Sequence, residues 1–269
     1  MTRVSFSFGQ NWEKYLTERH PDAVRSMMSY FQTWLPGGLA NRRLVDVGSG
    51  SGLSSFVAHQ MGARVTSIDV DPSSVAATTR LWEAAGSPST WWVSEGSILD
   101  SGFVDSLGTF DVVLSWGVLH HTGELWQAMS EIVRLVEPKG LLWIALYTRT
   151  RRSGQSLRLK ELYNRAPDRL KPLLRTAYAA PKLAKMTMRR DFTPITRYHE
   201  ERGMDWWRDI EDWLGGLPYE VASPSEVHSL LWPLGFTLER LKSAEGEGDN
   251  DVYLYRRDRD PAKPRSSEQ

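Results

Sequence analysis

The chain has 269 residues, of which 41% are hydrophobic and 25% are charged. This composition is ordinary for a globular protein and excludes a disordered or fibrous chain. Lys plus Arg and Asp plus Glu both number 33, so the net charge indicates no particular class of partner. There is no cysteine, which excludes disulfides, thiolate catalysis and Cys-ligated metal sites.

The sequence predicts no targeting or membrane segment. Residues 1–9 lack the apolar stretch of a signal peptide. The longest apolar run, Leu141 to Tyr147, is too short to cross a bilayer. We therefore expect a cytoplasmic protein with no membrane partner.

Apolar runs alternate with helical segments in the first half of the chain. Strands are expected over residues 44–47, 64–69, 90–94, 110–116 and 141–147, with helices over residues 51–60, 72–83 and 123–136. Such strands, separated by helices, indicate a parallel sheet covered on both faces. After a helix that begins at Pro224, strands follow over residues 236–241 and 252–256. Too few residues separate this last pair for a crossover helix, which predicts an antiparallel hairpin.

The predicted fold class is therefore α/β, with a mostly parallel sheet and an antiparallel last strand. We expect an N-terminal lid or helical segment (residues 1–40), a ligand-binding core (41–148), a helical insertion (149–222), a helix and hairpin that complete the core (223–257) and a disordered tail (258–269). 

Charge is unevenly distributed around the predicted insertion. Residues 149–190 contain 13 basic and 2 acidic side chains, whereas residues 191–227 contain 3 basic and 9 acidic ones. Mutual pairing or exposure to solvent is the simplest use for these neighbouring segments.

The most informative motif is Asp46-Val-Gly48-Ser-Gly50-Ser-Gly52, where the first strand turns into a helix. Open α/β sheets bind ligands at this place, and glycines let a ligand approach the backbone. A dinucleotide turn would have Gly or Ala where Leu53 stands, and Asp46 would repel a pyrophosphate. Asp46 suits a cationic amino group, which S-adenosylmethionine carries without any phosphate. The alternative is an ordinary glycine-rich turn.

With this motif, the chain resembles the class I S-adenosylmethionine-dependent methyltransferases over roughly residues 42–148. Ser67-Ile-Asp69-Val-Asp71 resembles the family's second motif, in which an acid holds the ribose hydroxyls. The alternative for Asp69 is a helix cap, a role that fits Asp71 better. The family often has Asp where Ser97 stands. The resemblance implies a seven-stranded sheet.

The same resemblance implies S-adenosyl-L-methionine as the cofactor. The implied cofactor-binding residues are Asp46, Gly48, Ser49, Gly50, Gly52, Asp69, Val70, Gly96, Ser97, Ile98, Ser115 and Trp116.

Two aromatic segments outside this core are predicted to bind the methyl acceptor. One lies around Phe8 and Trp12 and would form a lid, or else a helix that packs on the sheet edge. The other lies in the insertion, where such methyltransferases commonly build an acceptor cap. Its predicted acceptor residues are Trp206, Trp207, Asp209, Trp213 and Tyr219. Simple helix packing is the alternative for these Trp residues.

Methyl transfer to a hydroxyl requires removal of a proton, and histidine is suited to this near neutral pH. His120 and His121 follow the fourth strand, and His199 lies in the insertion. The quinone O-methyltransferases of ubiquinone biosynthesis, which this run resembles, carry Glu-x-x-Glu-His there with a divalent metal. Gly117 and His120 replace both acids, so no metal is predicted. We favour His121 as the base; the alternative is that both are polar residues at a helix start.

The sequence thus predicts a transferase that methylates a small molecule, most naturally at the hydroxyl of a phenol, quinol or natural-product scaffold. Carboxyl O-methylation of a small acid or peptide terminus and an RNA-directed methyltransferase are alternatives, as is a non-catalytic cofactor-binding protein. No RNA-binding motif is found, so a nucleic-acid partner is not expected. The sequence does not fix the oligomeric state, and a homodimer is compatible with it.

If Asp46 faces a cationic group, S-adenosylmethionine and its demethylated product S-adenosylhomocysteine should bind with micromolar affinity, and NAD should not bind. Asp46→Ala should weaken binding by about 1.5–3 kcal/mol, because a charge-assisted contact is lost. Calorimetry measures both. Binding of NAD in place of S-adenosylmethionine would contradict this cofactor assignment.

Overall fold

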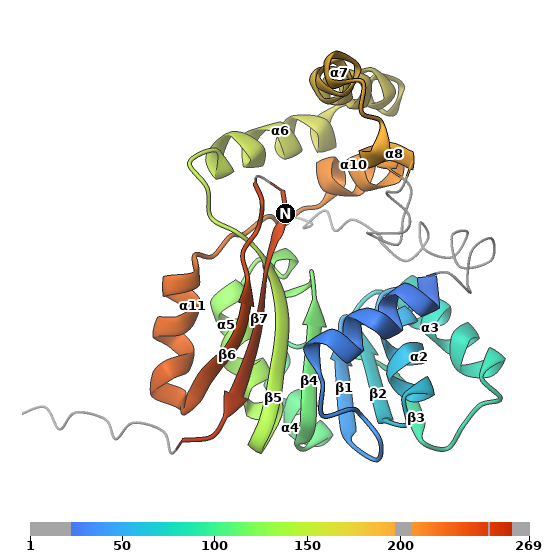
Figure 1. Ribbon diagram of the computed structural model, residues 1–269, viewed down its shortest axis with the longest axis vertical. Coiled ribbons are helices and arrows are strands. Elements are labelled where there is room, and N and C mark those ends of the chain that lie inside the picture. Colours follow the sequence, from blue (N-terminus) through green and yellow to red (C-terminus); the bar gives the residue numbers. More distant parts are fainter. Residues whose placement is uncertain (1–22, 197–205, 247, 260–269) are drawn as a thin grey trace, which may run out of the picture.

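The computed structural model describes residues 23–196, 206–246 and 248–259. Its centre is a seven-stranded sheet with the order β3-β2-β1-β4-β5-β7-β6 (Figure 1). Neighbouring strands from β3 to β5 are parallel, and β7 runs antiparallel to both of its neighbours, β5 and β6. The predicted fold class is confirmed, including the terminal antiparallel hairpin.

The strands follow the expected order along the chain. They are β1 (Arg43–Val47), β2 (Arg64–Asp69), β3 (Trp91–Glu95), β4 (Phe110–Trp116), β5 (Val136–Tyr147), β6 (Phe236–Lys242) and β7 (Asn250–Arg257). The strand order reverses at β1, which has β2 on one side and β4 on the other. Ligands bind at such a reversal, beyond the carboxyl ends of the strands.

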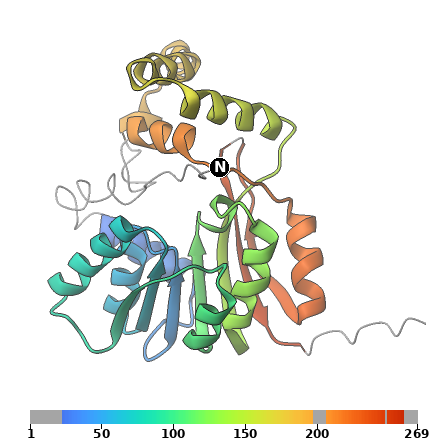
Figure 2. The same cartoon turned by 180° about the vertical axis from the view of Figure 1, so that it is seen from behind.

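Helices cover the sheet and form a separate group above its carboxyl edge (Figures 1 and 2). Around the sheet lie a helix over residues 23–34, α2 (Leu53–Gln60), α3 (Pro72–Ala84), α4 (Ser101–Leu107), α5 (Leu125–Ile132) and α11 (Pro224–Leu231). In the described part of the insertion lie α6 (Ser153–Arg165), α7 (Lys171–Arg189), α8 (Thr193–Thr196) and α10 (Trp206–Gly215). Short 3-10 turns are η1 (Leu119–His121), η2 (Val133–Leu135), η3 (Asp168–Leu170) and η4 (Trp232–Leu234).

Each face of the sheet has its own apolar core. Helices α4, α5 and α11 bury Val104, Met129 and Leu231 against one face. Helices α2 and α3 and the helix over residues 23–34 cover the other face, with Phe31 and Val57 among the buried residues. Both cores lie below the carboxyl edge, so they hold the strand ends in fixed positions.

Aromatic packing attaches the helix over residues 23–34 to the sheet. The rings of Tyr30 and Trp34 stack on Trp143 of β5 at centroid distances of 5.8 Å each, and Phe31 meets it edge-on at 4.9 Å. Trp116 at the end of β4 joins the same cluster, 5.8 Å from Trp143. Several of the twelve Trp residues therefore serve the core.

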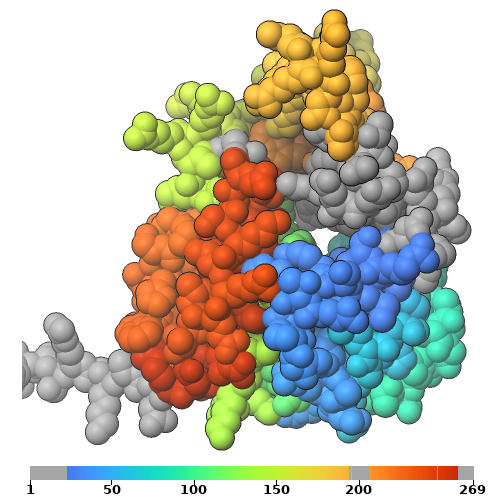
Figure 3. Space-filling model, in the orientation of Figure 1, coloured from blue at the N-terminus to red at the C-terminus, as the bar shows by residue number. Residues whose placement is uncertain are grey.

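The insertion has a third apolar cluster of its own. It contains Tyr163 of α6, Ala179 of α7, and Trp206, Ile210 and Trp213 of α10. In Figure 3 the α7 region, in gold, projects above the core. Burial within this cluster lets the insertion hold its shape above the strand ends.

The basic segment is mainly exposed. Among the described residues, two ion pairs join the basic and acidic segments: Arg175 of α7 with Glu211 of α10 at 2.6 Å, and Arg149 with Glu226 at 3.0 Å. Other arginines of the segment are exposed, namely Arg151, Arg152, Arg158, Arg165, Arg169, Arg189 and Arg190. This arrangement agrees with the expectation that the charges face solvent or the acidic segment.

Three features differ from the expectations. Helix α4 was not predicted, because it is short and buries one residue, Val104. The single helix expected over residues 123–136 is divided into α5 and one 3-10 turn, η2, and β5 begins earlier than expected, at Val136. Arg259, placed in the predicted tail, instead lies 3.5 Å from the Trp232 ring.

Within the described part of the chain, no helix is long and apolar enough to cross a membrane.

Phe31→Ala should lower the free energy of unfolding by about 3–5 kcal/mol, because it leaves a cavity against Trp143. The neighbouring exposed residue supplies the control: Gln32→Ala should change stability by no more than about 0.5 kcal/mol. Urea unfolding measures both. Equal effects of the two substitutions would contradict this packing.

Candidate functional site

The glycine turn between β1 and α2 is tightly packed at Gly48 and Gly52 and has free space beside Gly50. Gly48, Gly50 and Gly52 all have positive φ, at 78°, 54° and 80°. A Cβ atom on Gly48 would lie 2.4 Å from the Val118 side chain, and one on Gly52 would lie 2.8 Å from the Cα of Thr78. A Cβ atom on Gly50 would meet nothing within 4 Å. A ligand can therefore approach the backbone at Gly50.

Asp69, at the end of β2, holds this turn from the side. One carboxylate oxygen accepts the Gly50 N–H at 2.9 Å, and the other accepts the Asp71 N–H at 2.9 Å. Burial raises the pKa of Asp69 above its ordinary value. Asp71 caps α3 by accepting the Ser73 N–H, so its interpretation as a helix cap is confirmed. Asp69 keeps lone pairs for a ligand, since a carboxylate can accept more than two hydrogen bonds.

Asp46 lies beneath the turn at the end of a buried chain of hydrogen bonds. The Ser55 hydroxyl donates to Asp46 at 2.6 Å, the Ser67 hydroxyl donates to Ser55 at 2.6 Å, and the Trp91 indole donates to Ser67 at 2.8 Å. Burial, and to a smaller extent the nearby Asp69, raise the pKa of Asp46 to about 6, against the opposing hydrogen bond from Ser55.

The turn is therefore acidic, and its two carboxyl groups have hydrogen bonds but no positive partner among the described residues. Neither Asp46 nor Asp69 forms an ion pair with a residue that the structure describes. Asp46 is only 2% exposed, so it would act on a ligand chiefly through its charge. A cationic ligand near the turn would relieve the repulsion between the two carboxyl groups.

Some of the other predicted cofactor residues lie near the turn, at the carboxyl edge of the sheet. The Gly96 N–H donates to the Asp69 carbonyl at 2.9 Å, and Ser97 accepts the Leu99 N–H at 3.1 Å. Val70 is 66% exposed beside Asp69, and Trp116 is 39% exposed at the end of β4. These positions leave surface for a ligand.

Three predicted cofactor residues have structural contacts instead. The Ser115 hydroxyl is fully buried and donates to the Val47 carbonyl at 3.0 Å, which ties β4 to β1. Ser49 shares a hydrogen bond of 3.0 Å with Thr78 of α3. Ile98 belongs to the core that contains α4 and α5. A cofactor contact by these side chains stays a prediction, to which this placement adds no support.

The two predicted histidines lie in η1, directly after β4, and have opposite tautomers. His121 Nδ1 lies 2.7 Å from the carbonyl oxygen of Pro218. A carbonyl only accepts, so Nδ1 carries the proton and Nε2 is the basic nitrogen of the neutral ring. His120 Nδ1 accepts the Tyr147 N–H at 3.1 Å, so in its neutral ring Nε2 carries the proton.

The pKa values of both histidines are lowered. Burial is the main cause for each, and nearby Lys160 lowers both further. The pKa of His121 falls to about 4 in spite of its bond to Pro218, and that of His120 falls well below its ordinary value. Both rings are therefore neutral at pH 7, where His121 can accept a proton and His120 can donate a hydrogen bond.

A strap, which we define as residues 216–222, connects the insertion to these histidines. Besides the Pro218 carbonyl, the Glu220 N–H donates to the His120 carbonyl at 3.0 Å. The Glu220 carboxylate accepts the Leu125 N–H and so caps α5. The Ala222 N–H donates to the Tyr147 carbonyl at 3.1 Å. The strap thus fixes the position of η1 relative to β5.

An aromatic cage around Lys160 completes the site. Lys160 of α6 is fully buried, and its ammonium group donates to the carbonyl of Trp213. The ammonium nitrogen lies 4.4, 4.9 and 5.6 Å from the ring centroids of Trp213, Tyr219 and Tyr147. The Tyr147 ring is also 4.0 Å from that of His120 and 5.4 Å from that of His121. The cage and the histidine pair therefore form one cluster, in which Lys160 and His120 are fully buried and Tyr147 and His121 are partly buried.

The predicted acceptor residues are separated by this arrangement. Trp213 and Tyr219 belong to the cage, and Trp213 also lies in the insertion's own core together with Trp206, which has no part in the cage. Trp207 is 38% exposed, and Asp209 lies on the same helix. Three further predicted site residues lie outside the described residues, namely Phe8, Trp12 and His199.

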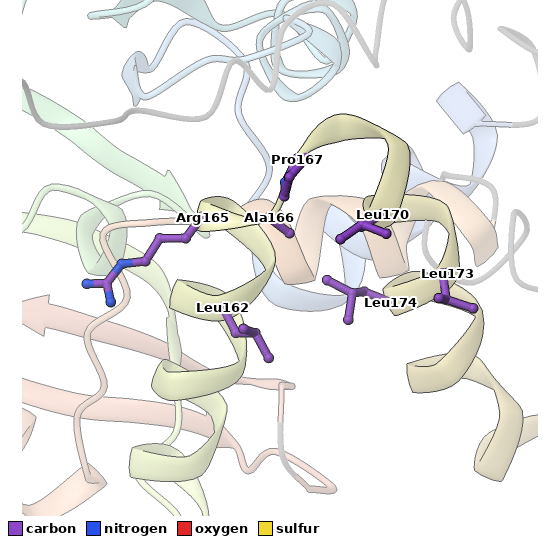
Figure 4. Close-up of a pocket in the computed structure, with 7 residues that line it drawn as sticks. All are labelled: Leu162, Arg165, Ala166, Pro167, Leu170, Leu173 and Leu174. Atoms are coloured by element: carbon purple, nitrogen blue, oxygen red, sulfur yellow. The ribbon is translucent and has the colours of Figure 1, made fainter.

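An apolar pocket of about 360 Å³ lies elsewhere in the insertion (Figure 4). It is lined by Leu162, Arg165, Ala166, Pro167, Leu170, Leu173 and Leu174, which come from α6, α7 and the connection between them. None of its lining residues is among the predicted site residues.

Sequence reasoning missed Tyr147 and Lys160. Helix α6 buries Ser153, Ser156, Lys160 and Tyr163 and leaves Leu162 58% exposed. Hydropathy therefore indicates the wrong face of this helix. The spacing of Lys160 three residues before Tyr163 was the available signal.

Comparison with known protein families concerns the part of the chain that contains the glycine turn and β1 to β5. Residues 45–144 match the family model described as a methyltransferase domain. The chain carries a class I S-adenosylmethionine-dependent methyltransferase domain. The matched region begins at Val45, just before Asp46, and ends within β5.

Two relatives are ubiquinone biosynthesis O-methyltransferases. That of Rhizobium etli is 28% identical over 119 residues, covering 44% of this chain and 46% of the relative. That of Methylocella silvestris is 31% identical over 120 residues, covering 45% of each. The match thus spans less than half of either relative's length.

Solved methyltransferase structures share the fold over most of the chain. Magnesium protoporphyrin IX methyltransferase from Synechocystis with bound SAH has a TM-score of 0.54 at 16% identity, covering 91% of this chain and 86% of that one. The N-methyltransferase NodS from Bradyrhizobium japonicum has a TM-score of 0.52 at 13% identity, covering 93% and 98%. At these identities the likeness concerns the fold alone.

Gly50→Ala should weaken S-adenosylhomocysteine binding to the methyltransferase domain at least about tenfold, since a methyl group would enter the open space over the turn. Gly86→Ala is the matched control: it has φ of 87°, equally open surroundings and a remote position. Both should pay a similar conformational cost of about 1–2 kcal/mol. Calorimetry and urea unfolding compare them. Equal affinity in the two variants would contradict a ligand site at Gly50.

Proposed function

We propose that this chain transfers the methyl group of S-adenosylmethionine to an oxygen atom of a small acceptor. The observation that carries the proposal is the His121 ring, whose Nδ1–H is held by the Pro218 carbonyl. This contact orients a neutral, proton-accepting Nε2 at the carboxyl end of β4, the strand next to the glycine turn.

The cofactor is proposed to lie across the turn between β1 and α2. The cofactor would contact the protein backbone at Gly50. Its positive charge would lie near the carboxyl groups of Asp46 and Asp69. Asp69 would use its remaining lone pairs for the ribose hydroxyls. These roles follow from the open space and the acidic character of the turn.

In the proposed reaction the acceptor oxygen attacks the methyl carbon in line with the carbon–sulfur bond. The new oxygen–carbon bond forms as that bond breaks, and S-adenosylhomocysteine leaves with both electrons on sulfur. The acceptor's proton passes to His121 Nε2 and then to solvent. Positioning supplies most of such a rate enhancement, and proton removal supplies a further part.

The acceptor is proposed to be a phenol, a quinol or a related natural-product scaffold. The rings of Tyr147, Trp213 and Tyr219 give the cluster the apolar, flat surfaces that suit such a molecule. The relatives named as O-methyltransferases support oxygen as the atom methylated. The proposed location of this biosynthetic reaction is the cytoplasm.

Carboxyl methylation is a second candidate, which the buried Lys160 favours. An ammonium group suits a carboxylate acceptor. A carboxylate is already ionised, so it would need no base.

His121→Ala should lower turnover of a hydroxyl acceptor by about 10²–10⁴ while cofactor affinity stays nearly constant. A base works only when unprotonated, so with a pKa of about 4 the wild-type rate should stay level from pH 8 to about 5 and fall nearer pH 4. Radiolabelled methyl transfer to a panel of catechols and hydroquinones measures this.

The control is His228→Ala, in α11, which should leave turnover unchanged. His120→Gln tests the other ring and should have the smaller effect, since Nδ1 of His120 already accepts a hydrogen bond. Full turnover of a hydroxyl acceptor by His121→Ala would rule out this base.

A further inference from the structure

We propose that Lys160 and His120 form a binding site for an oxyanion, so that the acceptor is bound as a phenolate or carboxylate beneath the insertion. The identification of this oxyanion with the methyl acceptor rests on the proposed function. The site itself is argued from the donors that the cluster contains.

Lys160 is an unusual residue to bury. Its side chain is 0% exposed, and burial of an ammonium group is costly unless strong partners surround it. The Trp213 carbonyl accepts a hydrogen bond from the ammonium group, and three aromatic rings surround the nitrogen at 4.4–5.6 Å. The cage stabilises a positive charge at this point of the molecule.

His120 adds a second donor. Because its Nδ1 accepts the Tyr147 N–H, its Nε2 carries a proton. That Nε2 atom is buried and has no hydrogen-bond partner among the described residues, in a side chain that is 1% exposed. Leaving such a donor unpaired costs about 1–3 kcal/mol, a cost that an oxygen ligand would remove.

The titratable groups around these donors are two histidines and two acids. His121 and His120 are both neutral at pH 7, and the positive Lys160 lowers the pKa of each. The nearby Glu220 carboxylate caps α5 by accepting the Leu125 N–H. Asp212 of α10 is the other buried acid close in sequence to the cage, one residue before Trp213.

The chemistry gives this site a purpose in methyl transfer. His121 Nε2 accepts the proton of a hydroxyl acceptor, which leaves a negative oxygen. The Lys160 ammonium and the His120 N–H would stabilise that oxygen in a buried, low-dielectric place, where such contacts are strong. A carboxylate acceptor would use the same two donors without proton transfer.

The test uses 4-nitrophenol, whose ionised form absorbs visible light, and its neutral methyl ether 4-nitroanisole, with the protein saturated by S-adenosylhomocysteine. Wild-type protein should bind the phenolate at least about tenfold more tightly than the ether, and so lower the apparent pKa of bound nitrophenol by about one unit or more. Equal binding of the two probes, or binding of neutral nitrophenol, would overturn the proposal without any variant.

Lys160→Met should abolish this preference, whereas Lys160→Arg should retain it. Lys182→Met is the matched control, because Lys182 lies 4.3 Å from the Tyr178 ring but is exposed on α7. A preference that survives Lys160→Met would overturn the role of Lys160. A parallel series with 4-nitrobenzoate and its methyl ester distinguishes a carboxylate site from a phenolate site.

Calorimetry with S-adenosylhomocysteine is run first on every variant. Wild-type protein that fails to bind it would contradict the proposed function, while the probe preference can still be measured alone. Normal S-adenosylhomocysteine binding with no probe preference would contradict only the oxyanion site.

Discussion

The candidate site depends on the burial of acidic groups beneath the glycine turn of β1. Asp46 is taken out of water next to Asp69, and a chain of hydroxyl and indole donors from Ser55 to Trp91 holds it there. Burying a carboxyl group in this way is costly, and the cost appears as the raised pKa of Asp46. A cationic ligand at the turn would offset that cost. S-adenosylmethionine, the proposed ligand, carries two such positive groups, a sulfonium and an ammonium.

The insertion supplies the second half of the site. Its strap gives His121 a carbonyl partner, and the edge of β5 gives His120 an N–H partner. One backbone partner is an acceptor and the other is a donor, so the two adjacent histidines have opposite neutral tautomers. Nε2 of His121 can accept a proton, and Nε2 of His120 can donate a hydrogen bond. Lys160 from α6 adds a positive charge beside both rings. The acid–base properties of η1 therefore depend on a segment about a hundred residues later in the chain.

The methyltransferase core was predictable because its requirements are local. A turn that must leave room at Gly50 needs glycine. Asp69 ends the next strand, 19 residues after Gly50, where its carboxylate can reach the turn. The order of strands and helices follows from apolar runs, and the terminal hairpin follows from the short gap before β7. Even here, the side-chain role of Ser115 was not visible, since its bond to the Val47 carbonyl depends on the pairing of β4 with β1.

The cage was not predictable for a physical reason. Helix α6 buries Lys160 and exposes Leu162, which reverses the usual relation between hydropathy and burial. Tyr147 and Tyr219 are distant in sequence and meet only because the strap returns to the end of β5. The tautomers of His120 and His121 likewise depend on partners 27 and 97 residues away. Such contacts arise from tertiary structure and leave no periodic pattern.

The most direct test of the account is the pH dependence of S-adenosylhomocysteine binding, measured by calorimetry in buffers with different heats of ionisation. If the ammonium group of the ligand acts on Asp46, binding favours the ionised carboxyl and lowers its pKa from about 6. Affinity should then fall about tenfold between pH 7 and pH 5, with protons released on binding near pH 6. Asp46→Asn should remove both effects. An affinity and a proton balance that stay constant across this range would contradict the account.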